Sequence, residues 1–210
     1  MTDRRFAYLH GFASGPLSRK GQYLARAFEA RGVKLELPDL NRPSFAQLSP
    51  SAALAAVGEL SGADTWSFIG SSLGGWLAAR FAELHPERIE RLVLLCPGFD
   101  LASRWPLLFG AERMAEWERR GSMEVADGAG QLVPLHWGFY AESRRLPPWP
   151  EVPRETLIVH GTRDEVVPIE GSRRYASERA HVTLVEVDDD HSLMESVDRI
   201  ADAAAKHFGL

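Results

Sequence analysis

The segment GSSLGG at Gly70–Gly75 follows a β-rich run at 65–69 and precedes a helix-forming run at 76–84. It therefore matches G-x-S-x-G at a strand-to-helix turn, a pattern that exposes a serine hydroxyl at the end of a buried strand. Glycines on both sides make so sharp a turn sterically possible. Ser72 is thus a candidate nucleophile. The same residues could also form a turn that only lets the helix pack on the strand, so other residues must decide.

Two later loops carry the groups that would activate such a serine. The apolar run 156–159 predicts a buried strand, and the loop after it ends at Asp164. The run 181–187 predicts another strand, followed by His191 and then by a helix over 193–208. An aspartate after a strand can be a turn former, and a histidine beside acids can be solvated surface. The order serine, acid, histidine, with each at a strand end, favours a catalytic triad.

The chemistry of these three groups is complementary. A neutral imidazole at position 191 can take the serine proton and return it to a leaving group, while the Asp164 carboxylate fixes the imidazole tautomer. Two backbone N–H groups are also needed to stabilise an oxyanion. Leu73 follows the serine and supplies the first. The strand predicted at 5–9 runs into a glycine-rich loop before a helix at about 18–31, and there Phe12 is predicted to supply the second.

With these residues the chain resembles the α/β-hydrolases, and in particular the small bacterial esterases of the YqiA type. Two stretches carry the resemblance: the nucleophile turn at Gly70–Gly75, and an opening stretch made of Tyr8–Phe12, Ser14, Pro16, Ser18 and Lys20. The acid loop at 160–164 looks more like that of general α/β-hydrolases. In the opening stretch, His10 is expected to brace the loop rather than act as a base.

The resemblance implies hydrolysis of a small-molecule ester or thioester through an acyl-enzyme. Peptide or carbon–carbon bond cleavage on the same triad stays open, because one fold hosts all these reactions. A rival of another class is a binding module that kept the hydrolase scaffold without its activity. The sequence leaves the acyl-chain length and the oligomeric state open.

Composition agrees with one enzyme domain over residues 1–210. The chain has 45% hydrophobic residues and a net charge of -5, and its basic pairs are dispersed among acids, which argues against a nucleic-acid partner. The first residues lead directly into a strand, and no apolar run is long enough to span a bilayer, so we expect a cytoplasmic location without a membrane span.

No cofactor or metal is implied by the sequence. The single cysteine, Cys96, ends the apolar run 91–95, where a buried structural thiol is expected. The histidines show no metal-ligand spacing, and the glycine-rich loops lack the lysine of a phosphate-binding loop.

The order of segments predicts an α/β-hydrolase fold, with a mostly parallel central sheet flanked by helices. In such a sheet the strands' carboxyl ends share one edge, so the catalytic loops can converge there. The alternation breaks at 98–150, which is too apolar for a disordered linker and predicts a helical cap. Its aromatic residues are expected to form mainly the cap's own core. Strands are predicted at about 5–9, 33–37, 65–69, 91–95, 156–160 and 182–187.

Overall fold

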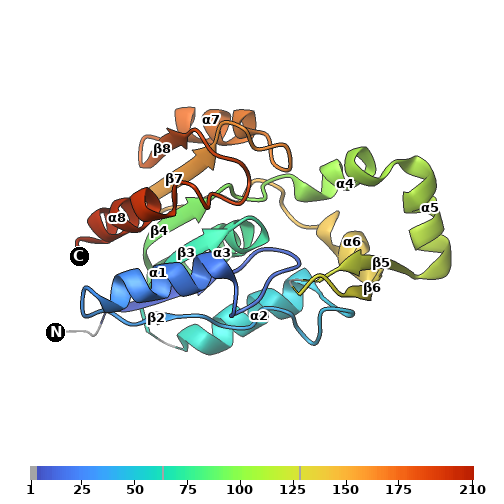
Figure 1. Ribbon diagram of the computed structural model, residues 1–210, viewed down its shortest axis with the longest axis horizontal. Coiled ribbons are helices and arrows are strands. Elements are labelled where there is room, and N and C mark those ends of the chain that lie inside the picture. Colours follow the sequence, from blue (N-terminus) through green and yellow to red (C-terminus); the bar gives the residue numbers. More distant parts are fainter. Residues whose placement is uncertain (1–3, 63, 128) are drawn as a thin grey trace.

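The computed structural model describes residues 4–62, 64–127 and 129–210. Its centre is a six-stranded sheet in the order β2-β1-β3-β4-β7-β8, in which every neighbouring pair is parallel. This architecture confirms the predicted fold class (Figure 1). The strands are β1 (Arg5–Leu9), β2 (Leu35–Glu36), β3 (Trp66–Ser71), β4 (Ile89–Leu95), β7 (Thr156–Gly161) and β8 (Val182–Val187).

The sequence of each strand reflects its place in the sheet. Strands β3 and β7 are buried at every residue, as expected for inner strands of a parallel sheet covered on both faces. Strand β2, at the edge, is shorter than the predicted run 33–37, since only Leu35 and Glu36 pair with β1.

Helices cover both faces of the sheet and bury two separate apolar clusters. Helices α1 (Arg19–Glu29) and α8 (Val197–Phe208) share one cluster with the sheet. Helices α2 (Pro50–Ser61) and α3 (Leu73–Leu84) contribute to the other. The remaining elements are a 3-10 helix η1 (Pro86–Arg88) and α7 (Ile169–Ser177), which packs on β7 and β8.

Helix ends are set by local polar contacts. The Ser18 hydroxyl accepts a hydrogen bond from the Gly21 amide and so caps the start of α1, a contact that contributes about 1 kcal/mol in typical helices. Helix α8 begins at Val197, later than predicted, because the Ser196 amide donates to the buried Asp189 carboxylate and Leu193 has a left-handed backbone. The segment from Leu193 to Ser196 therefore stays irregular.

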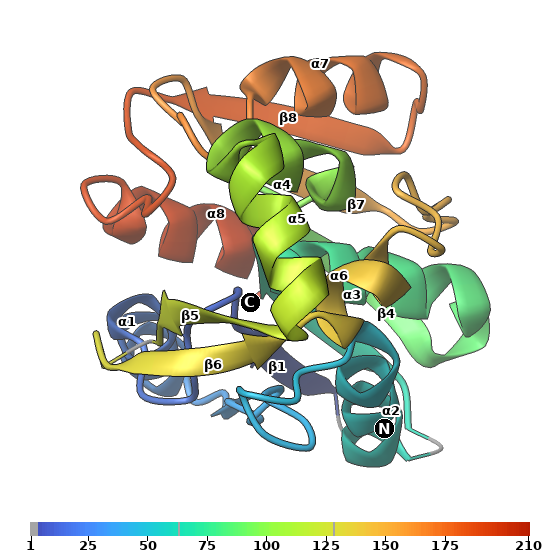
Figure 2. The same cartoon turned by 90° about the vertical axis from the view of Figure 1, so that its right-hand side faces the viewer.

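The cap lies between β4 and β7 in sequence and mixes helices with a hairpin. The sequence predicted the helices of this cap but not its hairpin, in which β5 alternates between covered and exposed residues as a half-covered strand does. Figure 1 shows the cap at one end of the sheet, and Figure 2 looks onto it. Its elements are α4 (Leu101–Phe109), α5 (Ala111–Arg120), the antiparallel pair β5 (Ser122–Ala126) and β6 (Leu132–His136), and α6 (Gly138–Ser143).

None of the helices in the described part of the chain is long and apolar enough to cross a membrane.

Candidate active site

Ser72 lies in a strained turn between β3 and α3. Its backbone adopts φ 53° and ψ -117°, a left-handed conformation that costs non-glycine residues about 1–3 kcal/mol. The turn is pinned on two sides: the Ser72 amide donates to the Leu95 carbonyl at the end of β4, and its carbonyl accepts from the Gly98 amide, both at 2.9 Å. The strain is thus maintained by contacts with the neighbouring strand and the loop after it.

The glycines of the turn are required by close backbone packing. A Cβ atom on Gly74 would lie 2.0 Å from the Leu9 carbonyl oxygen, and one on Gly70 would lie 2.4 Å from the Gly74 carbonyl oxygen. Neither neighbour is a flexible side-chain tip that could move aside. The G-x-S-x-G pattern therefore reflects how tightly α3 approaches β1 and β3.

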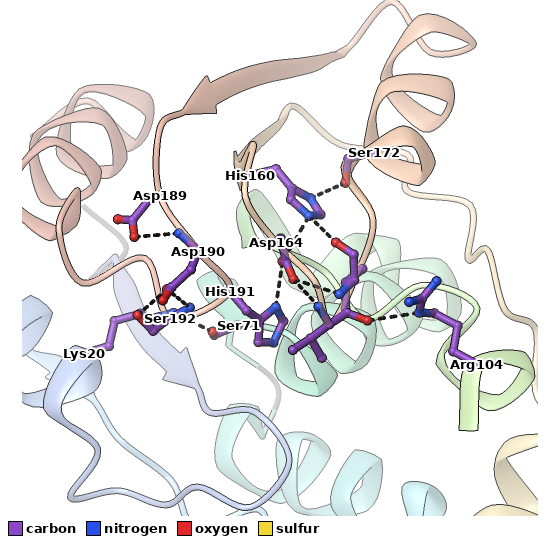
Figure 3. Close-up of polar contacts among 12 residues, drawn as sticks. Lys20, Ser71, Arg104, His160, Asp164, Ser172, Asp189, Asp190, His191 and Ser192 are labelled. Carbon is purple, nitrogen blue, oxygen red and sulfur yellow. Dashed lines mark hydrogen bonds and ion pairs between the residues drawn. The ribbon is translucent and has the colours of Figure 1, made fainter. Parts of the chain in front are cut away.

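Asp164 lies on the loop after β7, and its carboxylate is fully enclosed, with 0% of the side chain exposed. One oxygen, Oδ1, accepts from the amides of Val166 and Val167 at 2.9 and 2.8 Å. The other, Oδ2, lies 2.7 Å from His191 Nδ1 and 3.2 Å from His160 Nε2 (Figure 3). Burial alone would raise the pKa of Asp164, but these donors outweigh it and hold the pKa well below the usual range.

His191 is oriented by that carboxylate. Because a carboxylate only accepts, Nδ1 must carry the imidazole proton, which leaves the Nε2 lone pair free in the neutral ring. The side chain is 24% exposed, so the ring lies at the surface of the site rather than in the core. Structure thus brings Asp164 and His191 together. Within the described residues, Ser72 Oγ makes no hydrogen bond to His191, a contact that in other enzymes often tightens only when substrate binds.

The loops of the acid and the histidine are tied to each other. The Arg163 amide donates to the Asp189 carbonyl at 3.0 Å, and the Arg163 guanidinium pairs with Asp188 and Glu195, each at 2.9 Å. Asp190 and Ser192 flank His191, and the Asp190 carboxylate accepts hydrogen bonds from the Ser192 amide and hydroxyl. The acidic residues before the histidine therefore build the loop that holds it.

The predicted oxyanion donors lie on both sides of the turn. Gly11 packs directly against the serine, since a Cβ on it would lie 3.2 Å from Ser72 Cβ and 3.8 Å from Ser72 Oγ. Phe12 follows Gly11, and Leu73 is the first residue of α3. Neither the Phe12 nor the Leu73 amide has an acceptor among the residues that the structure describes. The two amides therefore remain the predicted oxyanion donors.

His10 braces the loop that carries Phe12. It is 3% exposed, its Nε2 accepts from the Leu40 amide at 3.0 Å, and its Nδ1 donates to the Gly11 carbonyl at 2.9 Å. Burial lowers the pKa of His10, which favours the neutral ring that this pair of contacts requires.

The cap aromatics form a packed core that reaches the site. Trp105, Trp117 and Phe139 are at most 3% exposed, so they are core residues, and they belong to the same apolar cluster as α2 and α3. The Phe12 ring packs into this core, with centroids 5.4 Å from Trp105 and 5.5 Å from Phe139. The loop beside Ser72 is thus anchored in the cap.

A cavity of about 270 Å³ opens beside the nucleophile turn. Its lining includes Leu73, directly after Ser72, and Gly98, whose amide bonds the Ser72 carbonyl. The walls combine α3 with cap residues and are mainly apolar, with Asp100 and Arg144 as charged groups. A ligand held there would lie between the nucleophile turn and the cap.

Lys20 is a residue of the site region to which sequence reasoning assigned no role. Its side chain is buried, and its Nζ donates to Ser71 Oγ at 3.1 Å, next to the nucleophile (Figure 3). Burial lowers the pKa of Lys20, and Asp164, Asp189 and Asp190 oppose that effect. The only sequence signal was its place in the opening stretch. Its hydrogen bond joins α1 to the end of β3.

Three potential metal ligands, Cys96, His160 and Asp164, lie within 4.8 Å of one another. Their chemistry fits a hydrogen-bonded cluster better than a metal site. Burial and the Asp164 charge raise the pKa of the Cys96 thiol, which keeps it protonated, and the Asp164 oxygens already have four donors. As expected from the sequence, Cys96 is buried.

Comparisons with known proteins agree with this architecture. A family model described as "Uncharacterised protein family (UPF0227)" matches residues 5–208. A 2-hydroxymuconate semialdehyde hydrolase of Pseudomonas putida is 27% identical over 203 residues, covering 78% of this chain and 72% of that protein. The mouse alpha/beta hydrolase domain-containing protein 10 superimposes with a TM-score of 0.79 at 18% identity, covering 100% of this chain and 90% of the mouse chain. Est1E from Butyrivibrio proteoclasticus, solved with ferulic acid, superimposes with a TM-score of 0.76 at 18% identity, covering 99% of this chain and 88% of the Est1E chain.

Proposed function

The chain belongs to the family UPF0227, and through its fold to the α/β-hydrolase superfamily, and from this premise we propose a function. The protein hydrolyses carboxylic esters with small to medium acyl chains. The observation that carries the proposal is the hydrogen bond between His191 and the enclosed Asp164, at the same end of the sheet as the turn in which Ser72 follows β3. The nearby cavity of about 270 Å³ lies just below the usual range of ligand-site volumes, about 300–1,000 Å³, which favours a small ligand.

In this mechanism, Ser72 Oγ attacks the ester carbonyl carbon while His191 Nε2 takes the hydroxyl proton. The carbonyl oxygen becomes an oxyanion and accepts hydrogen bonds from the amides of Phe12 and Leu73. The imidazolium gives its proton to the leaving alcohol oxygen, and an acyl-enzyme remains. Water then attacks the acyl carbon while His191 Nε2 takes its proton. The bond from the acyl carbon to Ser72 Oγ breaks, and the imidazolium returns the proton to Ser72 Oγ as the carboxylic acid leaves. Asp164 stays ionised throughout and stabilises the imidazolium.

Substitution of the nucleophile tests the proposal. Turnover of 4-nitrophenyl butyrate by Ser72→Ala should fall by about 10⁴- to 10⁶-fold, because triad members act as a unit. Ser177→Ala, at the exposed end of α7, is the matched control and should retain full turnover. Unchanged turnover in purified Ser72→Ala contradicts the assignment. No turnover in the wild-type protein with any ester favours the rival, a non-catalytic binding module.

Carbon–carbon bond hydrolysis on the same residues is a second candidate. It is favoured by two curated relatives described as 2-hydroxymuconate semialdehyde hydrolases. The kcat/KM for 2-hydroxymuconate semialdehyde, compared with those for 4-nitrophenyl butyrate and an acyl thioester, separates the reactions. A higher value for the semialdehyde makes ester cleavage the side activity.

A further inference from the structure

We propose that His160 is a positioning residue of this site, which holds the Asp164 carboxylate in place by donating to it from the side opposite His191. The inference rests on the proposed function, because it assigns Asp164 to the triad. His160 lies within β7 and is 0% exposed, so it touches neither solvent nor a ligand in the cavity. Any effect on catalysis must therefore act through Asp164.

The partners of His160 determine where its proton lies. Nε2 is 2.9 Å from the Val167 carbonyl oxygen and 3.2 Å from Asp164 Oδ2. Both are acceptors only, so Nε2 must carry the hydrogen, which bonds the Val167 carbonyl and lies within 3.2 Å, donor to acceptor, of Asp164 Oδ2. Nδ1 is 2.8 Å from the Ser172 hydroxyl, which can donate to the Nδ1 lone pair. The neutral ring therefore satisfies all its contacts in one tautomer (Figure 3).

With His160 in place, the Asp164 carboxylate has four donors for its two oxygens. The two backbone amides fix Oδ1, and the two histidines fix Oδ2 between them. Burial raises the pKa of Asp164, and several contacts lower it. The contact with His160 has the largest lowering effect. Without this donor, the carboxylate would rely on His191 alone at Oδ2, and both its angle and its charge density toward His191 would change.

Other charged or titratable groups face this pair from each neighbouring element. The Cys96 thiol at the end of β4 contacts Asp164, and Lys20 on α1 and Asp189 on the His191 loop act at longer range. Glu186 on β8 is paired across the sheet with His160 and is neutralised by Arg173. None of these groups replaces the donor that His160 supplies to Oδ2.

The test compares two substitutions at His160 in the full chain. His160→Leu removes the donor, and kcat for 4-nitrophenyl butyrate should fall about 10- to 100-fold with KM within twofold, as for a lost hydrogen bond to a charged group. Asp164 then becomes a stronger acceptor toward His191, so the acid limb of the pH–kcat profile should move to higher pH. His160→Gln keeps an N–H near the position of Nε2 and should restore most of kcat and the wild-type acid limb.

Ser172→Ala is the control for a purely structural role, because it removes a hydrogen bond of the same buried ring on the side away from Asp164. It should lower thermal stability while kcat stays within about threefold. The proposal is overturned if His160→Leu keeps kcat and its acid limb, or if His160→Gln is no better than His160→Leu.

A measurement on the wild-type protein covers the case in which His160→Leu does not fold. Imidazole ¹⁵N chemical shifts should show His160 protonated on Nε2 and His191 on Nδ1. A proton on His160 Nδ1 refutes the proposal, because Nε2 could not then donate to Asp164. Failure of the proposed function gives a different result, because the wild-type protein would then hydrolyse no substrate, whatever the tautomer of His160.

Discussion

Replacing Asp164 by asparagine keeps the shape of the side chain but turns one of its two terminal acceptors into a donor. Asn Oδ1 can still accept from the amides of Val166 and Val167, which lie 2.9 and 2.8 Å away. The new amide nitrogen then faces His191 Nδ1 and His160 Nε2, both of which donate in the wild-type protein. Two donor–donor conflicts replace two hydrogen bonds.

His191 can relieve its conflict by moving its proton from Nδ1 to Nε2. Nε2 then has no lone pair to take the proton of Ser72, so the base is lost although the fold is kept. In a serine protease the same substitution reduces turnover about 10⁴-fold, which corresponds to about 5.5 kcal/mol in the activation barrier. We expect a loss of that order for Asp164→Asn with 4-nitrophenyl butyrate.

The matched control is Asp188→Asn on the neighbouring loop. The Asp188 side chain is 89% exposed and pairs with Arg163 at the surface, where ion pairs contribute little. It should retain turnover within about twofold. Steady-state kinetics of both variants, with thermal melts to verify folding, provide the assay. A loss below tenfold in folded Asp164→Asn refutes the tautomer argument.

Four further predictions concern stability. Gly74→Ala should abolish folding, since its Cβ would lie 2.0 Å from the Leu9 carbonyl oxygen. Gly58 lies within α2, and a Cβ on it would lie 3.8 Å from its nearest neighbour, so Gly58→Ala should raise the free energy of unfolding in urea by about 0.5–1 kcal/mol. Leu135→Ala, fully buried in the cap hairpin, should cost about 2–5 kcal/mol in the same assay, and a cost below 1 kcal/mol contradicts the packing described. The pKa of Asp164 is lower in the folded protein than in the unfolded chain. The ionised carboxylate therefore contributes its full share to the free energy of unfolding above about pH 4, and this contribution is lost as the pH falls further. The stability gap between wild type and Asp164→Asn should therefore narrow from pH 5 to 3, and a constant gap is the contrary result.

The sequence predicted the central sheet because its inner strands are continuous apolar runs with turn residues after them. It also predicted that Asp164 and His191 would meet, since parallel strands deliver their loops to one edge. The structure bears out that meeting at 2.7 Å. The convergence followed from topology alone.

Other features depend on contacts that no local pattern encodes. The late start of α8 follows from the Asp189 carboxylate taking the Ser196 amide, seven residues away. The hairpin of the cap is stabilised by its pairing and by Leu135, whose carbonyl accepts from the Trp117 indole. The contact of His160 with Asp164 depends on how the loop after β7 folds back over its own strand.

The central claim is that the hydroxyl of Ser72 is the nucleophile, and covalent labelling tests it most directly. Wild-type protein treated with a fluorophosphonate probe should gain one label, which peptide mass spectrometry should locate on Ser72, and His191→Ala should label far more slowly. A folded wild-type protein that stays unlabelled, or that carries the label on Ser71 or any other serine, contradicts the account.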